Sequence, residues 1–217
     1  EIDAAVTDVD GVIRIFNALL RLAEIDTGMR RSGFVQVDVA EVAAKAVEFY
    51  LPAAELKGVT LSFCERGPVV VSGDRVLLAQ AVSNLIDNAL KFAPKDGTVI
   101  VETVRRSDSA VGIVVADDGP GIPDAEKPKV AQRFYRGDAS RGTPGVGLGL
   151  SLVGAIAKLH GGALELADNH PGLRAQMTLA AEPVAEVLRH AADPGVASGA
   201  RPRRIAKQPT AVPESSS

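Results

Sequence analysis

Aromatic residues and cysteine are the scarcest components of this 217-residue sequence. Tryptophan is absent, aromatic residues make up 4% of the chain, and the one cysteine, Cys64, cannot form an internal disulfide. The core must therefore consist mainly of Ala, Val, Leu and Ile side chains. The single cysteine indicates a reducing compartment.

Long apolar runs and a strong excess of one charge sign are also missing. No apolar run approaches the ~18 residues of a membrane span, and no signal-peptide pattern follows the first residue, Glu1. A formal net charge of −3 predicts no general attraction to nucleic acid. The 46% hydrophobic and 24% charged residues are typical of a globular protein, and exclude a collagen or a wholly disordered chain. We therefore expect a cytoplasmic chain.

Residues 1–30 carry the pattern of a separate helix. Apolar residues alternate at spacings of four and three over three heptads, and a second apolar stripe widens this face. So wide a face favours a helix bundle over a two-stranded coiled coil. The alternative is an ordinary N-terminal helix that packs on its own domain. The heptad residues are Ile2, Val6, Val9, Ile13, Phe16, Leu20 and Ala23.

Residues 34–182 alternate between short β-rich runs and amphipathic helices, which predicts one α/β domain. The remainder, 183–217, predicts a short helical run and then a disordered tail rich in proline and serine. A long Gly/Pro-rich stretch from Pro120 to Gly145 predicts a loop that is either functional or disordered. Strands are predicted at Phe34–Val37, Val59–Phe63, Val69–Val71, Val99–Val104, Val111–Ala116, Ala163–Leu166 and Ala175–Leu179, and helices at Val39–Ala54, Arg75–Phe92 and Gly147–Leu159.

Three polar side chains share one face of the predicted helix at 75–92. Asn84, Asn88 and Lys91 follow one another at spacings of four and three, and Asp74 is placed to cap the start of the helix. An amide oxygen is a neutral ligand suited to Mg²⁺, and an ammonium group suits phosphate. Taken alone, such residues are usually solvated surface groups.

Two glycine-rich segments complete the pattern. The first, Asp117-Asp118-Gly119-Pro120-Gly121-Ile122, ends a predicted strand, so its carboxylate can accept a hydrogen bond from a ligand amine while the glycines let a flat ligand approach. The second, Gly145-Val146-Gly147-Leu148-Gly149-Leu150, opens a helix whose N-terminal amides can bind phosphate. A Rossmann motif does not match this spacing, and a P-loop is excluded because no Gly-Lys-Ser/Thr occurs.

In this order and spacing the segments resemble the ATP-binding domain of sensor histidine kinases. The matching boxes are 84–92, 117–122, Arg133-Phe134-Tyr135-Arg136-Gly137 and 145–150. The wider superfamily includes type II topoisomerases, heat-shock chaperone ATPases and mismatch-repair ATPases. The resemblance implies a Bergerat-type fold, an α/β two-layer sandwich in which helices cover one face of a mixed sheet. Residues 1–30 would be the second helix of a truncated dimerisation hairpin.

The resemblance also implies a role for each matching residue. Asp117 would contact the adenine amine, Asn88 would bind Mg²⁺ with Asn84 beside it, and Lys91 would contact phosphate. A mobile lid over the nucleotide would extend from Pro123 to Pro144. The implied ATP-binding set is Asn84, Asn88, Lys91, Phe92, Asp117, Gly119, Gly121, Ile122, Arg136, Gly145, Val146, Gly147, Leu148 and Gly149, with Asn84, Asn88 and Lys91 catalytic.

The identity of residue 84 favours a kinase over a hydrolase. Hydrolases of the superfamily resemble one another in having Glu where this chain has Asn84, and a neutral amide cannot take a proton from water. The nucleophile would be a histidine on the first hairpin helix, which this sequence lacks. His160, His170 and His190 are all outside the seam, and none precedes an acidic residue.

Three functions remain open at this point. The first is the catalytic core of a histidine autokinase without its acceptor helix, acting with ATP and Mg²⁺. The second is a stand-alone protein serine kinase of the same fold, and the third is a non-catalytic nucleotide-binding or dimerisation module. The first implies a homodimer through the hairpin, a response regulator receiver domain as partner, and a parent protein anchored in the bacterial inner membrane through an upstream sensor region.

Overall fold

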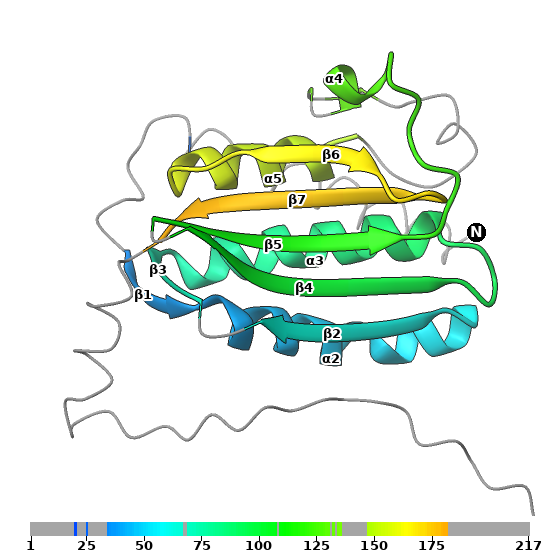
Figure 1. The fold of residues 1–217 in the computed structure, drawn as a ribbon, viewed down its shortest axis with the longest axis horizontal. Helices are drawn as coiled ribbons and strands as arrows, with labels where there is room; N and C mark the ends of the chain where they lie inside the picture. Colours follow the sequence, from blue (N-terminus) through cyan, green and yellow to red (C-terminus); the bar gives the residue numbers. More distant parts are fainter. Residues whose placement is uncertain are drawn as a thin grey trace, which may run out of the picture.

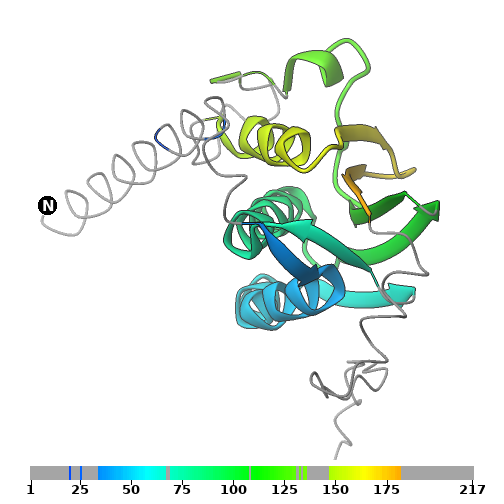
Figure 2. The same ribbon diagram turned by 90° about the vertical axis from the view of Figure 1, so that its left-hand side faces the viewer.

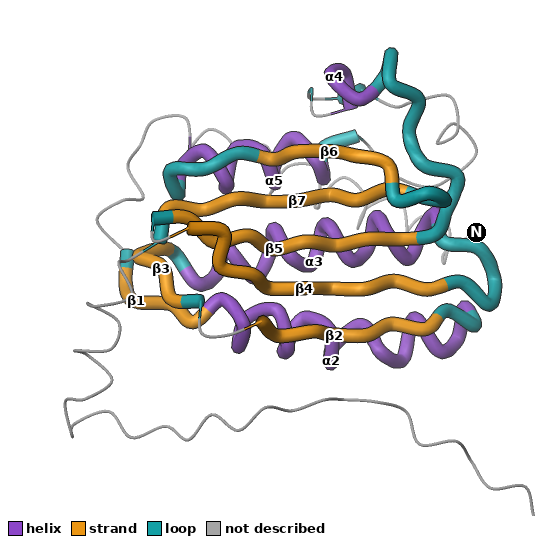
Figure 3. Tube along the Cα trace, in the orientation of Figure 1, coloured by secondary structure: helices purple, strands orange, loops and turns teal. Residues whose placement is uncertain are grey.

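The computed structural model describes residues 20, 25, 34–66, 69–107, 109–130, 132, 134–135 and 147–181. The predicted N-terminal helix and tail therefore lie outside the described residues, apart from Leu20 and Ile25, and both stay predictions. In chain order the elements are β1 (Val35–Asp38), α2 (Val39–Lys57), β2 (Thr60–Arg66), β3 (Val70–Gly73), α3 (Arg75–Phe92), β4 (Thr98–Ser107), β5 (Ala110–Asp117), α4 (Lys127–Val130), α5 (Gly149–Leu159), β6 (Leu164–Asp168) and β7 (Leu173–Ala180) (Figure 3).

A five-stranded mixed sheet with strand order β2-β4-β5-β7-β6 forms one layer of the molecule. The β2–β4 pair is parallel and the other pairs are antiparallel. Helices α2, α3 and α5 cover one face, and none of the described helices covers the other, which we call the open face (Figures 1 and 2). This arrangement confirms the predicted two-layer sandwich. A separate two-stranded sheet joins β1 and β3.

The main helices begin where the sequence supplies caps. The Asp74 carboxylate accepts hydrogen bonds from the backbone N–H groups of Val76 and Leu77, so α3 begins at the predicted residue, Arg75. The helix also ends at the predicted residue, Phe92. Asp38 caps α2 in the same way. Helix α5 starts at Gly149, two residues later than predicted, because Gly147 has a φ of +75°, which is outside the helical region.

The core lies between the sheet and the three helices and is almost entirely aliphatic. The apolar face of α3, which carries Leu77, Leu78, Ala81, Leu85 and Ala89, is buried against the sheet. No helix in the described ranges is long and apolar enough to cross a bilayer.

His160 ends α5 and ties that helix to α3. Its ring is 4% exposed and stacks on Phe34 with 4.7 Å between centroids. Nε2 accepts a hydrogen bond from the backbone N–H of Asp74 at 3.0 Å, and Nδ1 lies 2.8 Å from the Ile156 carbonyl. His160 is the C-cap residue of α5, so these contacts give it a structural role.

We expect His160→Ala to lower the free energy of unfolding by about 2–3 kcal/mol, because both hydrogen bonds and the ring contact are lost. Chemical denaturation measures this change. Lys158→Ala, at an exposed position of the same helix, is the matched control and should change stability by less than about 0.5 kcal/mol. Equal stability of the two variants would contradict a structural role for His160.

Candidate functional site

The predicted site segments meet at one end of the molecule. The C-terminal ends of α3 and β5, the N-terminal end of α5 and the β6–β7 turn all lie at the right-hand end of Figure 1. Segments far apart in the sequence therefore border the same region. The geometry at Asp117 shows how closely they are joined.

Asp117 is the central buried group at this end. It is 4% exposed, and its Oδ1 atom accepts hydrogen bonds from the backbone N–H groups of Gly119 at 2.9 Å and Leu173 at 3.3 Å. Its Oδ2 atom accepts none from the residues that the structure describes. Burial raises the pKa of the Asp117 carboxyl above its usual value. One oxygen therefore holds the loop, and the other makes no hydrogen bond within the described residues.

The β6–β7 turn also supports Asp117, and sequence reasoning missed this contact. The Asn169 side chain donates a hydrogen bond to the Asp117 carbonyl at 2.8 Å. Gly172, at φ +107°, packs directly against the backbone of residues 117 and 118. The Asn-His-Pro-Gly sequence predicts a turn, but nothing local in it predicts which strand end the turn contacts.

Gly119 allows the glycine-rich loop to contact the end of α3. A Cβ atom at this position would lie 2.8 Å from the Phe92 carbonyl oxygen, so a larger residue would force the segments apart. Asp118 connects the same loop to the start of β4, because its Oδ2 accepts a hydrogen bond from the Thr98 N–H at 2.8 Å. The structure thus brings together the predicted residues Phe92, Asp117 and Gly119.

The polar face of α3 borders the same end. Asn84, Asn88, Lys91 and Phe92 are all half-buried, whereas Asp87, the nearest carboxylate on the helix, is exposed. The Lys91 ammonium lies 5.2 Å from the Phe92 ring centroid. The α2 residue Lys57 donates to the carbonyls of Leu90 and Lys91, which fixes the end of the helix.

The second glycine box is partly described. Gly147 accepts a hydrogen bond from the Phe134 N–H at 3.1 Å, Leu148 is buried, and Gly149 is exposed at the first turn of α5. Arg136, Gly145 and Val146 lie outside the described residues, so their assignments stay predictions. The amides at the start of α5 remain suited to an anionic ligand.

A pocket of about 470 Å³ lies beside the loop that follows Asp117. Its walls are the loop at 119–124 and the turn at 168–172, and they include the predicted residues Gly119, Gly121 and Ile122. Lys127 of α4 connects the two walls through ion pairs with Asp124 at 2.6 Å and Asp168 at 2.9 Å. Asp117 itself does not line this pocket.

The side-chain oxygens at this end of the fold suit a metal ion that is coordinated mainly by the phosphates of a bound nucleotide. Within the described part of the chain, no cluster of three or more His, Cys, Asp or Glu side chains could hold a metal ion. Asn84 and Asn88 supply neutral amide oxygens, which are ligands for Mg²⁺ when phosphate oxygens and water complete its shell. The residues therefore fit a nucleotide-bound Mg²⁺.

Comparison with known proteins identifies the class. Residues 73–183 match the profile of the histidine kinase-, DNA gyrase B-, and HSP90-like ATPase family. The chain belongs to this family, as the catalytic ATP-binding domain of a sensor histidine kinase.

Individual relatives agree with this assignment. The signal transduction histidine-protein kinase/phosphatase MprB of Mycobacterium sp. (strain KMS) is 48% identical over 102 residues, which cover 47% of this chain and 20% of MprB. Sensor protein IrlS of Burkholderia pseudomallei (strain K96243) is 33% identical over 175 residues, covering 80% of this chain and 37% of IrlS. The solved structure of the mycobacterial sensor histidine kinase MprB aligns with a TM-score of 0.60 and 32% identity, covering 69% of this chain and 99% of that one. The chain thus spans about a fifth to a third of these two curated relatives.

Proposed function

We propose that this chain binds Mg-ATP around Asp117 and presents the γ-phosphoryl group to a histidine supplied by another helix. The observation that carries the proposal is the convergence of a buried carboxylate, the polar face of α3 and the N-terminus of α5 at one end of the fold. The adenine amine would donate to Oδ2 of Asp117. The backbone N–H groups of Gly119 and Leu173 donate to Oδ1 instead, so they do not compete for Oδ2.

The phosphates would extend from the adenine towards α3 and α5. Lys91 and the exposed amides at Gly149 would contact the phosphate oxygens, and Asn88, with Asn84 beside it, would hold Mg²⁺ against them. The metal would neutralise charge on the transferring phosphoryl group. The half-buried Asn84 offers no base for activating water, so positioning and charge stabilisation would dominate catalysis.

Transfer needs a nucleophile that these residues do not supply. A histidine ring nitrogen would attack the γ-phosphorus in line, the bond from phosphorus to the β–γ bridging oxygen would break, and ADP would leave. A carboxylate beside that histidine would take the ring proton. Of the two histidines in the described residues, His160 is buried and hydrogen-bonded, and His170 is exposed in the β6–β7 turn.

The test first uses γ-labelled Mg-ATP with the chain alone. A relative that carries the histidine hairpin, and whose own ATP site has been disabled by substitution, is then added. We expect ATP binding with little bound label or free phosphate at first, and acid-labile label on the hairpin after its addition. Asn88→Ala should abolish that transfer. Rapid phosphate release would indicate a hydrolase, and acid-labile label on the chain alone would show that one of its own histidines accepts.

The remaining parts of the proposal concern the parent protein. We infer a homodimer formed through a helix hairpin that includes the N-terminal helix, a sensor region anchored in the membrane, and a response regulator receiver domain that takes the phosphoryl group from histidine. The relatives' names as sensor and signal transduction kinases support this assignment.

A further inference from the structure

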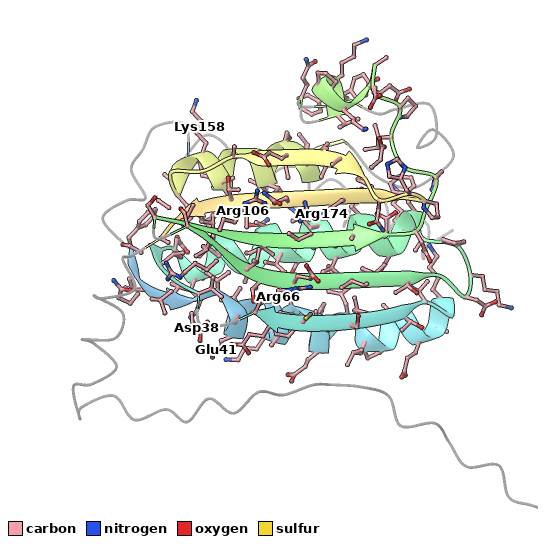
Figure 4. All side chains as sticks on the ribbon, viewed as in Figure 1. Asp38, Glu41, Arg66, Arg106, Lys158 and Arg174 are labelled. Carbon is pink, nitrogen blue, oxygen red and sulfur yellow. The ribbon has the colours of Figure 1, made fainter. Side chains whose placement is uncertain are left out.

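The open face of the sheet carries two arginines that converge on one buried side chain. Arg106 donates to Oε1 of Gln176 at 2.6 Å, and Arg174 donates to the same oxygen at 2.9 Å. Gln176 is only 2% exposed although it lies on the open face, which the described helices leave uncovered. Figure 4 shows Arg106 and Arg174 side by side over this face.

Local backbone features bring Arg106 to this position. The β4–β5 register shifts between Arg105 and Ser107, and such an irregularity re-aims the side chain of the residue inside it. From there the Arg106 side chain passes over Gly112 of β5, where an added Cβ would contact its Cγ and Cδ at 3.7 and 3.5 Å. A glycine inside a strand commonly marks such a close approach.

The two guanidinium groups are held close together, and neither forms an ion pair with a carboxylate in the described part of the chain. Two short bonds to one oxygen place their nitrogens within about 5.5 Å of each other. The carboxylate nearest to them in the network is Glu165, which accepts a hydrogen bond from Nε2 of Gln176 at 3.2 Å. On the same face, by contrast, Arg66 is paired directly with Glu102 at 3.0 Å.

We infer that Arg106 and Arg174 form a binding site for an oxyanion, separate from the nucleotide site. A phosphate or carboxylate group placed between the guanidiniums would accept hydrogen bonds from both and relieve their mutual repulsion. Gln176 would act as the positioning residue, because its buried amide orients both arginines. The oxyanion is either a free phosphate-type ion or an acidic group on a partner protein, and both share this recognition chemistry.

A purely structural role for the two arginines is the competing explanation. Val114 lies on the open face and is 1% exposed, so nearby side chains must cover it. Methionine keeps an aliphatic stem and removes the charge, and therefore separates the two roles. Arg66→Met is the matched control, because Arg66 lies on the same face but its guanidinium is already neutralised by Glu102.

The test is an NMR titration of the full chain, with the nucleotide site saturated by Mg-ADP. Inorganic phosphate is one probe and a Glu-rich peptide the other, and the Gln176 side-chain amide and the Gly112 N–H are the reporters. We expect saturable shifts that weaken about tenfold or more in Arg106→Met and in Arg174→Met but persist in Arg66→Met. Denaturation should show all three variants folded.

Each outcome decides the inference. Tighter binding of the peptide would indicate a protein partner, and tighter binding of phosphate a free ion, both through the same two arginines. The inference is overturned if neither probe gives saturable shifts, or if binding survives in both arginine variants. It is equally overturned if Arg66→Met weakens binding as much, because general surface charge would then explain the shifts.

Discussion

Asp117→Asn is expected to weaken ATP binding about a hundredfold while the protein stays folded. The asparagine carbonyl can still accept the N–H groups of Gly119 and Leu173, but the second oxygen becomes an NH₂ group. That group cannot accept a hydrogen bond from the adenine amine, and two donors would face each other in a buried site. A site whose buried polar groups lose their partner rejects a ligand strongly. Calorimetric titration with a non-hydrolysable ATP analogue measures the loss.

The matched control is Asp118→Asn, which changes the neighbouring carboxylate in the same way. Asp118 accepts the Thr98 N–H and has no assigned contact with nucleotide, so ATP affinity should change by less than about threefold. Asp117→Ala is a poorer test, because it also leaves two backbone N–H groups without an acceptor, at a cost of about 1–3 kcal/mol. Unchanged affinity in Asp117→Asn would remove Asp117 from the adenine site.

Burial of Asp117 also gives this prediction a pH dependence. Because folding raises its pKa, the ionised carboxylate destabilises the fold, and the stability present at low pH is lost as pH rises through the folded pKa. Protonation of Oδ2 would replace the acceptor for the adenine amine with a donor. ATP affinity should therefore fall on acidification at a higher pH than the ~4 of an ordinary aspartate, and Asp117→Asn should lack this transition.

Most of the fold could be predicted because its elements depend on local patterns. Helix α3 matches its predicted bounds, since the Asp74 cap and the 3.6-residue apolar period agree there. Two neighbouring apolar runs predict strands at 99–104 and 111–116, and the structure pairs them as the antiparallel strands β4 and β5. Strand ends shifted by one to three residues, because pairing across the sheet, not local propensity, decides where a strand stops.

Non-local contacts account for what the sequence could not predict. The pairing of β1 with β3 as a separate sheet joins strands with a whole helix between them. The support of Asp117 by the turn at 169–172 depends on sheet order, which places β7 beside β5. The candidate site residues were predicted from their type, their spacing and the family resemblance, and these assignments stay predictions. That only one oxygen of Asp117 accepts the N–H groups of Gly119 and Leu173 could be seen only in the three-dimensional arrangement.

Gly172→Ala is expected to lower the free energy of unfolding by about 3 kcal/mol or more and to weaken ATP binding as well. Its φ of +107° is accessible to glycine but strained for alanine, and the added Cβ would overlap the carbonyl of Asp117. Relief of that overlap would move the turn and the Asn169 side chain away from Asp117, and the Leu173 N–H would leave Oδ1. Thermal unfolding and analogue titration measure the two effects.

Gly154→Ala is the matched control for this substitution. A Cβ at Gly154 meets no atom within 4 Å, and the residue lies inside α5, where alanine is favoured over glycine. We therefore expect the free energy of unfolding of this variant to rise by about 0.5–1 kcal/mol and its ATP affinity to stay unchanged. If Gly172→Ala matched it in both measurements, the turn would not be what holds Asp117 in place. If Gly172→Ala lost stability alone, the turn would support the fold without positioning the carboxylate for adenine.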